Sequence, residues 1–210
     1  MDKVRVLIIG AGPAGCTCGL LLRKRNIDCM LVDRAVFPRD KICGGGLTPR
    51  SYALLSRLLP TFRYDYNSVQ RIKLLLDGRQ VLDLQNIREL RIVKRREFDA
   101  QLLAEYQKSG GAFTNDALTA IEERDGQVIA TFRSGRQIAC EYLVGADGAN
   151  SRVRKYLTHH PSPAATCCVW SSTDRSRLIM PLSSMSRRAT SRDITTASQM
   201  PTMTCRALAT

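Results

Sequence analysis

The sequence predicts an α/β fold, in which helices cover a parallel sheet and antiparallel hairpins are inserted between its strands. The apolar run VRVLIIG at residues 4–10 leads into a glycine-rich turn and then a helical pattern. A second apolar run, IDCMLVD at residues 27–33, completes a β-α-β order. Residues 141–157 return as a strand, a turn and a helix. This order is typical of folds that bind dinucleotides.

The segments between these strands and turns also show a clear periodicity of apolar residues. A helix over residues 96–111 has Phe98, Leu102, Leu103 and Tyr106 at core spacing and is followed by glycine. The remaining expected elements are a helix over 13–26, a helix from residue 50 or 51 to 59, a hairpin over 69–84 turning at Asp77-Gly78, a strand at 90–95, and short strands meeting at Asp125-Gly126 and Ser134-Gly135.

Composition indicates a folded chain in a reducing compartment. Apolar residues make up 44% of the 210 residues, which is enough for a core, and no run reaches the roughly 18 apolar residues of a membrane span. The eight cysteines follow no disulfide spacing and no export signal is present, so we expect reduced thiols in the cytoplasm. We expect no metal site, because no CxxC occurs and the two histidines are adjacent.

The net charge of +13 does not by itself identify a partner. Lysine and arginine are scattered along the chain, few aromatic residues lie between them, and no nucleic-acid-binding motif is present. We therefore expect no nucleic-acid partner. A basic surface also suits phosphate groups or a membrane face.

The composition changes abruptly near Thr158. All 14 glycines lie at or before Gly148, whereas residues 159–210 hold 17 serines and threonines and have no sustained period. We therefore expect a folded domain over 1–158 and a separate tail over 159–210. The tail is either a disordered extension or a stretch outside the ancestral reading frame that replaces the rest of a longer protein. The abruptness of the change favours the second interpretation.

The first strand-to-helix turn carries the motif GAGPAG. Gly10 permits a tight turn, Gly12 lets the backbone approach a pyrophosphate, and Gly15 allows the helix to pack closely on the strand. Asp33 ends the second strand, 23 residues after Gly10, where a carboxylate can hold ribose hydroxyls. An acidic residue there favours a dinucleotide without a 2′-phosphate on that ribose, so the motif predicts FAD or NAD.

Two further motifs carry a resemblance to a family. Arg95 stands three places before Phe98 in VKRREFD, and Asp147-Gly148 lies in VGADGANSRVR. With the glycine motif, they resemble flavoproteins of the para-hydroxybenzoate-hydroxylase-like FAD fold. The segment FPRDKICGGGLTPR at residues 37–50 is most similar to the geranylgeranyl reductase family. The resemblance covers about residues 3–158.

The resemblance implies a Rossmann-like FAD-binding domain, incomplete at its C-terminus, in an oxidoreductase. Such enzymes use FAD, reduced by NAD(P)H, to saturate carbon–carbon double bonds of isoprenoids. A lipid substrate of this kind implies contact with a membrane surface. The resemblance assigns the following residues to FAD binding or to the vicinity of the flavin: Gly10, Gly12, Gly15, Asp33, Arg34, Arg39, Cys43, Gly44, Gly45, Arg95, Asp147 and Gly148.

Cys43 has two interpretations of equal weight. A thiol near Arg39, Lys41 and glycine N–H groups can serve as a catalytic proton donor once hydride has left the flavin, or it is a small residue that fits against the flavin ring. We also expect Ala117 to offer its backbone to the adenine.

Two other functions remain open. The glycine, arginine and A-D-G motifs also occur in aromatic monooxygenases and flavin-dependent halogenases, and a non-catalytic nucleotide-binding remnant is a third alternative. Residues 159–210 hold no glycine, so the second G-D segment that completes the family's flavin site is not encoded there. We therefore expect the chain to hold FAD weakly and to have little or no reductase activity.

Overall fold

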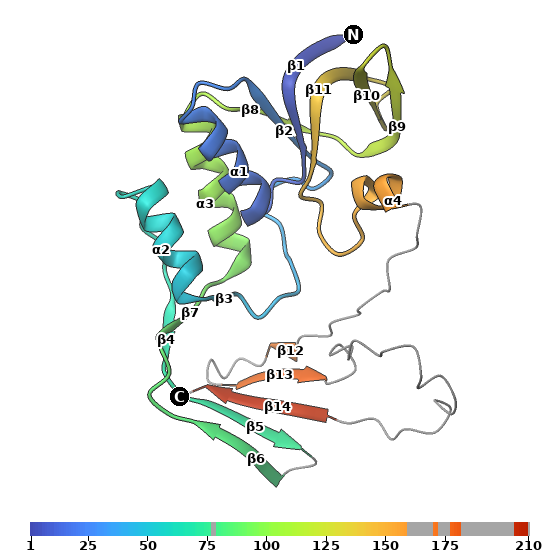
Figure 1. Ribbon diagram of the computed structural model, residues 1–210. Helices are drawn as coiled ribbons and strands as arrows, with labels where there is room; N and C mark the ends of the chain where they lie inside the picture. The colour runs from blue at the N-terminus through green and yellow to red at the C-terminus, as the bar shows by residue number, and fades with distance from the viewer. Residues whose placement is uncertain (77–78, 159–169, 172–176, 182–203, 210) are drawn as a thin grey trace, which may run out of the picture. The chain divides into compact units, whose positions relative to one another are not determined.

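The computed structural model describes residues 1–76, 79–158, 170–171, 177–181 and 204–209 (Figure 1). The chain divides into two compact units. The first unit comprises residues 1–41, 54–64 and 95–163, and the second comprises residues 42–53, 65–94 and 164–210.

The first unit is built on a six-stranded mixed sheet with the order β8-β2-β1-β11-β10-β9. Strand β1 lies in the middle and pairs in parallel with β2 on one side and β11 on the other, and β8 extends the parallel part beyond β2. Strands β10 and β9 add an antiparallel meander after β11. The strands are β1 (Asp2–Ile9), β2 (Cys29–Asp33), β8 (Ala112–Asn115), β9 (Leu118–Arg124), β10 (Gln127–Phe132) and β11 (Gln137–Gly145).

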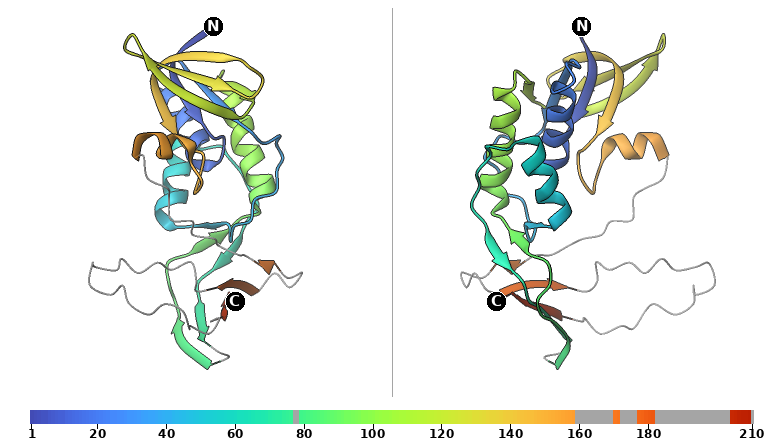
Figure 2. Two further views of the ribbon diagram at one scale, coloured as in Figure 1. Left: turned by 90° about the vertical axis from the view of Figure 1, so that its right-hand side faces the viewer. Right: turned by 60° about the vertical axis from the view of Figure 1, so that its left-hand side comes forward.

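Helices α1 (Pro13–Arg23) and α3 (Arg95–Lys108) pack side by side next to this sheet (Figure 2). Gly19 of α1 makes their contact close, because a Cβ placed there would lie 2.6 Å from Cε2 of Tyr106 in α3. Helix α4 (Arg152–Thr158) follows β11, and helix α2 (Pro49–Leu58) buries Leu55 and Leu58.

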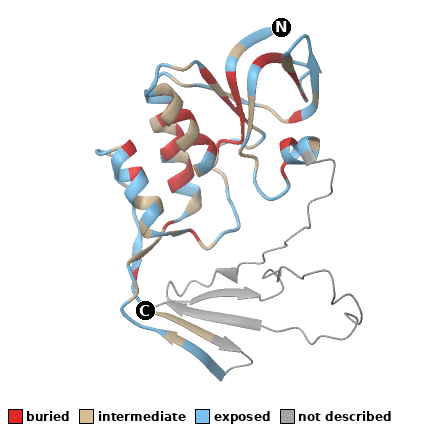
Figure 3. Ribbon diagram, in the orientation of Figure 1, coloured by how far each residue is buried: buried red, intermediate tan, exposed pale blue. Residues whose placement is uncertain are grey.

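The core lies between these helices and the parallel strands (Figure 3). Leu7, Ile8 and Leu31 of the central strands are fully buried, as the continuous apolar runs of a covered parallel sheet require. On α3, the buried side chains include Phe98, Leu102, Leu103 and Tyr106, which confirms the core spacing expected for that helix.

The second unit contains a three-stranded antiparallel sheet and a five-stranded sheet, with the orders β3-β7-β4 and β12-β13-β14-β5-β6. Arg71, just before the strand that starts at Ile72, donates from Nε and Nη2 to the two carboxylate oxygens of Asp83, at 2.9 and 2.6 Å. The strands are β3 (Gly46–Leu47), β4 (Asn67–Val69), β5 (Ile72–Leu76), β6 (Arg79–Leu84), β7 (Leu90–Ile92), β12 (Trp170–Ser171), β13 (Arg177–Pro181) and β14 (Thr204–Ala209).

The expected α/β fold with inserted hairpins is confirmed, with shifts at the element ends. The first helix ends at Arg23 rather than residue 26, because Asn26 adopts a left-handed φ of 55° and its N–H donates to the Arg23 carbonyl. Val69 belongs to β4 and pairs with β7, so the hairpin begins at Ile72. Its expected turn at Asp77-Gly78 lies outside the described residues. Strands β3 and β8 were not predicted as strands.

Most of the predicted tail, residues 159–210, lies outside the described residues; the part described is strands β12, β13 and β14. Over the part of the chain that the structure describes, no helix is both long enough and apolar enough to cross a bilayer. The same residues contain no group of three side chains suited to bind a metal ion.

Tyr106 provides a test of how α3 is fixed to the sheet. Its hydroxyl lies in donor geometry 3.0 Å from the carbonyl oxygen of Cys29 in β2 and 3.2 Å from that of Ala112 in β8. Burial raises the pKa of Tyr106 well above its usual value, so the hydroxyl stays protonated and remains a donor. We expect Tyr106→Phe to lower the free energy of unfolding by about 1–2 kcal/mol, measured by urea denaturation.

Tyr142→Phe is the matched control, because Tyr142 is 59% exposed. It should change the free energy of unfolding by less than about 0.5 kcal/mol. Equal effects of the two substitutions would contradict the role of the Tyr106 hydroxyl.

Candidate dinucleotide-binding site

The first strand-to-helix turn is held by direct contacts between backbone segments. Gly10 has φ +105°, and a Cβ placed on it would lie 2.4 Å from the carbonyl oxygen of Ala146. A Cβ on Gly15 would lie 1.7 Å from the carbonyl oxygen of Gly10. No side chain fits at either position, so the sequence G-x-x-x-x-G here follows from packing as well as from any ligand.

Asp33 ties the end of β2 to the same turn. One carboxylate oxygen accepts the N–H of Ala11 at 2.7 Å, and the other accepts the N–H of Ala35 at 2.8 Å. A carboxylate has about four acceptor positions, so two remain after these bonds. Asp33 can therefore bind ribose hydroxyls while it holds the loop.

Gly12 is the N-cap of α1 and faces two arginines. A Cβ placed there would lie 3.4 Å from Nη2 of Arg39 and 4.0 Å from Nη2 of Arg95. The missing side chain thus leaves a space bordered by two guanidinium groups at the N-terminus of a helix. Both the helix dipole and the guanidinium charges favour an anion in such a space.

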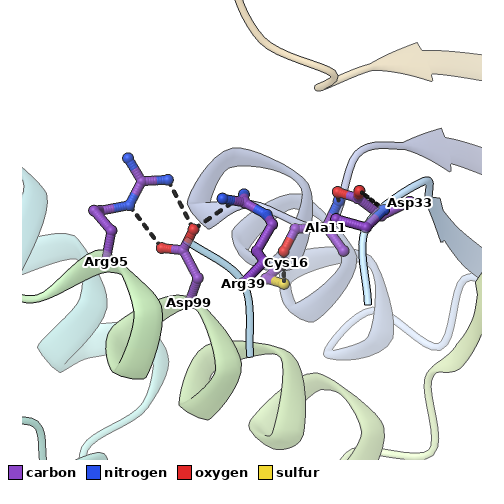
Figure 4. Close-up of polar contacts among 7 residues, drawn as sticks. Ala11, Cys16, Asp33, Arg39, Arg95 and Asp99 are labelled. Carbon is purple, nitrogen blue, oxygen red and sulfur yellow. Dashed lines mark hydrogen bonds and ion pairs between the residues drawn. The ribbon is translucent and has the colours of Figure 1, made fainter. Parts of the chain in front are cut away.

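Both arginines converge on the buried carboxylate of Asp99 (Figure 4). Arg95 donates to it from Nε at 2.7 Å and from Nη2 at 2.8 Å, and Nη2 of Arg39 lies 3.1 Å from it. Asp99 is completely buried, and the arginine side chains are only 16% and 17% exposed. The group of two cations and one anion keeps one net positive charge.

One donor in this cluster lacks a hydrogen-bond partner among the described residues. Nη1 of Arg39 is buried and has none. An unsatisfied buried donor costs about 1–3 kcal/mol, and more when it is charged. An acceptor atom of a ligand within reach of Nη1 would remove that cost.

Cys16 lies beneath the glycine turn and is kept as a neutral thiol. Its Sγ donates to the carbonyl oxygen of Ala11 at 3.2 Å, and it is completely buried. Burial, followed by the carboxylates of Asp99 and Asp33, raises the pKa of Cys16 to about 12. Cys16 therefore acts as a small core residue.

The Asp147-Gly148 turn lies directly against the glycine turn. The N–H of Ala146 donates to the carbonyl of Ile9 at 2.8 Å, and Cα of Asp147 would be 2.9 Å from a Cβ on Gly10. Oδ2 of Asp147 accepts the N–H of Arg152 at 2.7 Å, while its buried Oδ1 has no hydrogen-bond partner among the described residues. This carboxylate therefore offers an open acceptor beside the turn.

The structure places the other predicted residues of the first unit as follows. Arg34 is exposed. Ala117 already uses both backbone groups: its N–H donates to Asp116 Oδ1 at 2.7 Å, and its carbonyl accepts the N–H of Arg133 at 2.8 Å. Only the second lone pair of that carbonyl remains for an adenine.

Cys43, Gly44 and Gly45 belong to the second unit. Cys43 is exposed, and its Sγ accepts a weak hydrogen bond from the N–H of Gly45 at 3.5 Å. Gly45 has φ +70°, and a Cβ on it would lie 2.0 Å from the carbonyl oxygen of Val93. Packing against the chain after β7 therefore requires glycine at this position, whether or not a flavin lies nearby.

The motifs noted in the sequence did not assign roles to Asp99 and Ser151. Asp99 stands four residues after Arg95, the spacing at which helical side chains meet. This spacing was the signal in the sequence that could have indicated their ion pair. Oγ of Ser151 accepts the N–H of Arg154 at 2.9 Å, so it acts as the N-cap of α4. The serine of the A-D-G-x-x-S pattern thus begins the helix.

Thiol labelling tests the contrast between Cys16 and Cys43. At pH 8, a thiol of pKa about 12 has a thiolate fraction of roughly 1 in 10⁴, so Cys16 should resist iodoacetamide in the native protein. Exposed Cys43 should be modified. Peptide mapping by mass spectrometry checks both, with labelling in urea as the control; native modification of Cys16 ahead of Cys43 would contradict the placement.

Known proteins share sequence and fold with this chain. The chain is 30% identical over 164 residues to a menaquinone reductase of Mycobacterium tuberculosis, covering 74% of this chain and 40% of that protein. It is 28% identical over 173 residues to the chloroplastic geranylgeranyl diphosphate reductase of Arabidopsis thaliana, covering 74% and 36%. The chain thus spans about 40% or less of the length of these relatives.

The fold is similar to that of the flavin-dependent monooxygenase PieE, whose structure was determined in complex with FAD and substrate. The TM-score is 0.62 and the identity 17%, over 99% of this chain and 43% of that one. A likeness at this identity concerns the fold alone. The model of the FAD binding domain family, however, matches residues 3–199, so the chain belongs to the FAD binding domain family.

Proposed function

We propose that this chain is the FAD-binding part of an oxidoreductase that reduces carbon–carbon double bonds of an isoprenoid lipid, with NAD(P)H as the electron donor. The observation that carries the FAD assignment is the space at Gly12. It lies at a helix N-terminus and is bordered by Arg39 and Arg95. A pyrophosphate group matches its charge and its need for hydrogen-bond acceptors.

The other predicted residues have roles that fit the same ligand. Asp33 keeps two acceptor positions for the ribose hydroxyls, and Oδ1 of Asp147 is a buried acceptor beside the turn that a ligand hydroxyl would satisfy. Gly10, Gly15 and Gly148 shape the backbone around them, since Gly10 and Gly148 have positive φ values. Arg34 and Ala117 are also proposed FAD contacts, with fewer supporting observations.

The isoprenoid substrate is supported by the C-G-G-G-L segment after Asp33 and by the similarity to a geranylgeranyl diphosphate reductase. Reduced flavin supplies hydride when it is bound, and a proton must then reach the other carbon of the double bond. Cys43 has an exposed thiol, and we propose it as the donor. A lipid substrate would bring the protein to a membrane surface, which its basic net charge would favour.

A flavin-dependent monooxygenase is the second candidate. The resemblance of the glycine, arginine and A-D-G motifs extends to that class, and the contacts around Gly12 suit either activity equally. Products separate the two candidates: the reductase forms a saturated isoprenoid without oxygen, whereas the monooxygenase forms an oxygenated product and consumes oxygen.

Flavin titration of the purified chain tests the FAD assignment. We expect FAD to bind, weakly, with a change in flavin absorbance and fluorescence. Gly12→Ala should retain the fold, because its Cβ would lie at ordinary contact distances, 3.4 Å from Nη2 of Arg39 and 4.0 Å from Nη2 of Arg95. It should lower FAD affinity about tenfold or more by filling the space.

Gly46→Ala is the matched control, since a Cβ there would have ordinary contacts of 3.6–3.8 Å in the second unit. It should leave FAD affinity unchanged. Absence of FAD binding by the unaltered chain up to millimolar concentrations would reject the proposed cofactor.

Substitution of Cys43 tests the proton-donor assignment. In anaerobic assays of an intact homologue with NADPH and a geranylgeranyl substrate, alanine at the position of Cys43 should lower double-bond reduction by about 10²-fold or more, the usual contribution of a general acid. Flavin reduction by NADPH, measured by absorbance, should be unaffected. Unchanged turnover would leave Cys43 with a packing role only.

A further inference from the structure

We propose that Asp99 is a positioning residue for the anion site: its carboxylate holds the guanidinium groups of Arg39 and Arg95 so that both face the space at Gly12. This inference rests on the proposed function, because it takes the pyrophosphate of FAD as the anion. Asp99 contacts the arginines and not the ligand, and it therefore acts through them.

The cluster joins two parts of the chain that are far apart in the sequence. Arg39 comes from the loop after β2, and Arg95 is the first residue of α3. Arg95 and Asp99 form a two-point pair at 2.7 and 2.8 Å, which fixes both the position and the plane of the guanidinium group. The third contact, at 3.1 Å, ties the loop arginine to the same carboxylate.

Burial makes the arrangement rigid. Asp99 has no exposed surface, so its charge has lost water and must be compensated by the two arginines. The carboxylate cannot turn away without becoming an unpaired buried charge. Arg39 and Arg95 are consequently held in place before any ligand arrives, which reduces the entropy lost on binding.

Stability alone does not account for this cluster. A buried ion pair can often be replaced by apolar residues with no loss of stability, and this cluster leaves Nη1 of Arg39 buried without a hydrogen-bond partner among the described residues. Another open feature lies on the Gly12 side, where Nη2 of both arginines borders the space. A site built to receive acceptor oxygens has these features.

Two effects of Asp99 on a bound phosphate have opposite signs. The negative charge of the carboxylate repels the phosphate, so its loss would strengthen binding if net charge were decisive. The same carboxylate holds two charge-assisted donors, so its loss would weaken binding if position were decisive. The sign of the change in FAD affinity therefore tells which effect dominates.

The experiment compares FAD affinity of the unaltered chain, Asp99→Asn and Glu97→Gln by fluorescence titration, with circular dichroism as a check of the fold. Glu97 lies in the first turn of the same helix and is exposed, so Glu97→Gln removes the same charge without touching the cluster. We expect Asp99→Asn to weaken FAD binding about 10- to 100-fold, equivalent to one charge-assisted hydrogen bond. Glu97→Gln should leave affinity unchanged or slightly stronger.

Arg95→Lys keeps the inference testable if Asp99→Asn does not fold. Lysine preserves the charge but cannot form the two-point pair with a carboxylate, so we expect a similar loss of FAD affinity. The double variant Asp99→Asn with Arg95→Lys should lose less than the product of the two single losses, because both substitutions break the same contact. If Asp99 acted only in folding, the two substitutions would change FAD affinity independently, and the loss in the double variant would equal the product of the two single losses.

The outcomes separate the two proposals. If the unaltered chain does not bind FAD, the proposed function and this inference both fail. If it binds FAD and Arg95→Lys or a folded Asp99→Asn binds as tightly, the positioning role is wrong and the proposed function stands. Stronger binding by Asp99→Asn would likewise overturn the positioning role, because net charge would then dominate.

Discussion

The contact between the backbones of Gly10 and Gly15 is the constraint on which the site depends. The carbonyl oxygen of Gly10 occupies the place where a side chain at residue 15 would begin, 1.7 Å from that Cβ position. Helix α1 can therefore start immediately above the end of β1. The unpaired N–H groups of its first turn then lie next to Gly12, at the end of the helix that favours a phosphate. Ala146, against Gly10, brings the turn after β11 to the same point.

The charges around this turn are arranged so that folding and ligand binding do not conflict. Two arginines without a counter-charge would repel each other in a partly buried site, and Asp99 offsets that repulsion. One net positive charge remains beside the helix N-terminus. Asp33 and Asp147 are kept to the flanks by N–H bonds from Ala11, Ala35 and Arg152, so their charges are positioned by the backbone. A ligand with anionic and hydroxyl parts would meet separate groups here.

Sequence periodicity predicted the β-α-β core and helix α3, because the spacing of their apolar residues matches the residues that are buried in the structure. It did not predict β3 or β8, since two- and four-residue strands depend on partners that are distant in the sequence. Among the site residues, glycines and Asp33 could be recognised because a turn imposes them locally. Asp99 could not be assigned a role in the same way: its i,i+4 spacing from Arg95 is visible, but the contact with Arg39 exists only in three dimensions.

The two halves of the segment FPRDKICGGGL belong to different units of the structure. Its first half belongs to the first unit through Arg39, which is fixed to Asp99, and through Asp40, which pairs with Arg96 at 3.1 Å. Its second half, from Ile42, belongs to the second unit, where the carbonyl of Gly45 accepts the N–H of Val93 and Gly45 has no room for a side chain. The basic residues and the glycines therefore answer different physical requirements. A substitution at Arg39 acts on the anion site, whereas a substitution at Gly45 acts first on the packing next to β7.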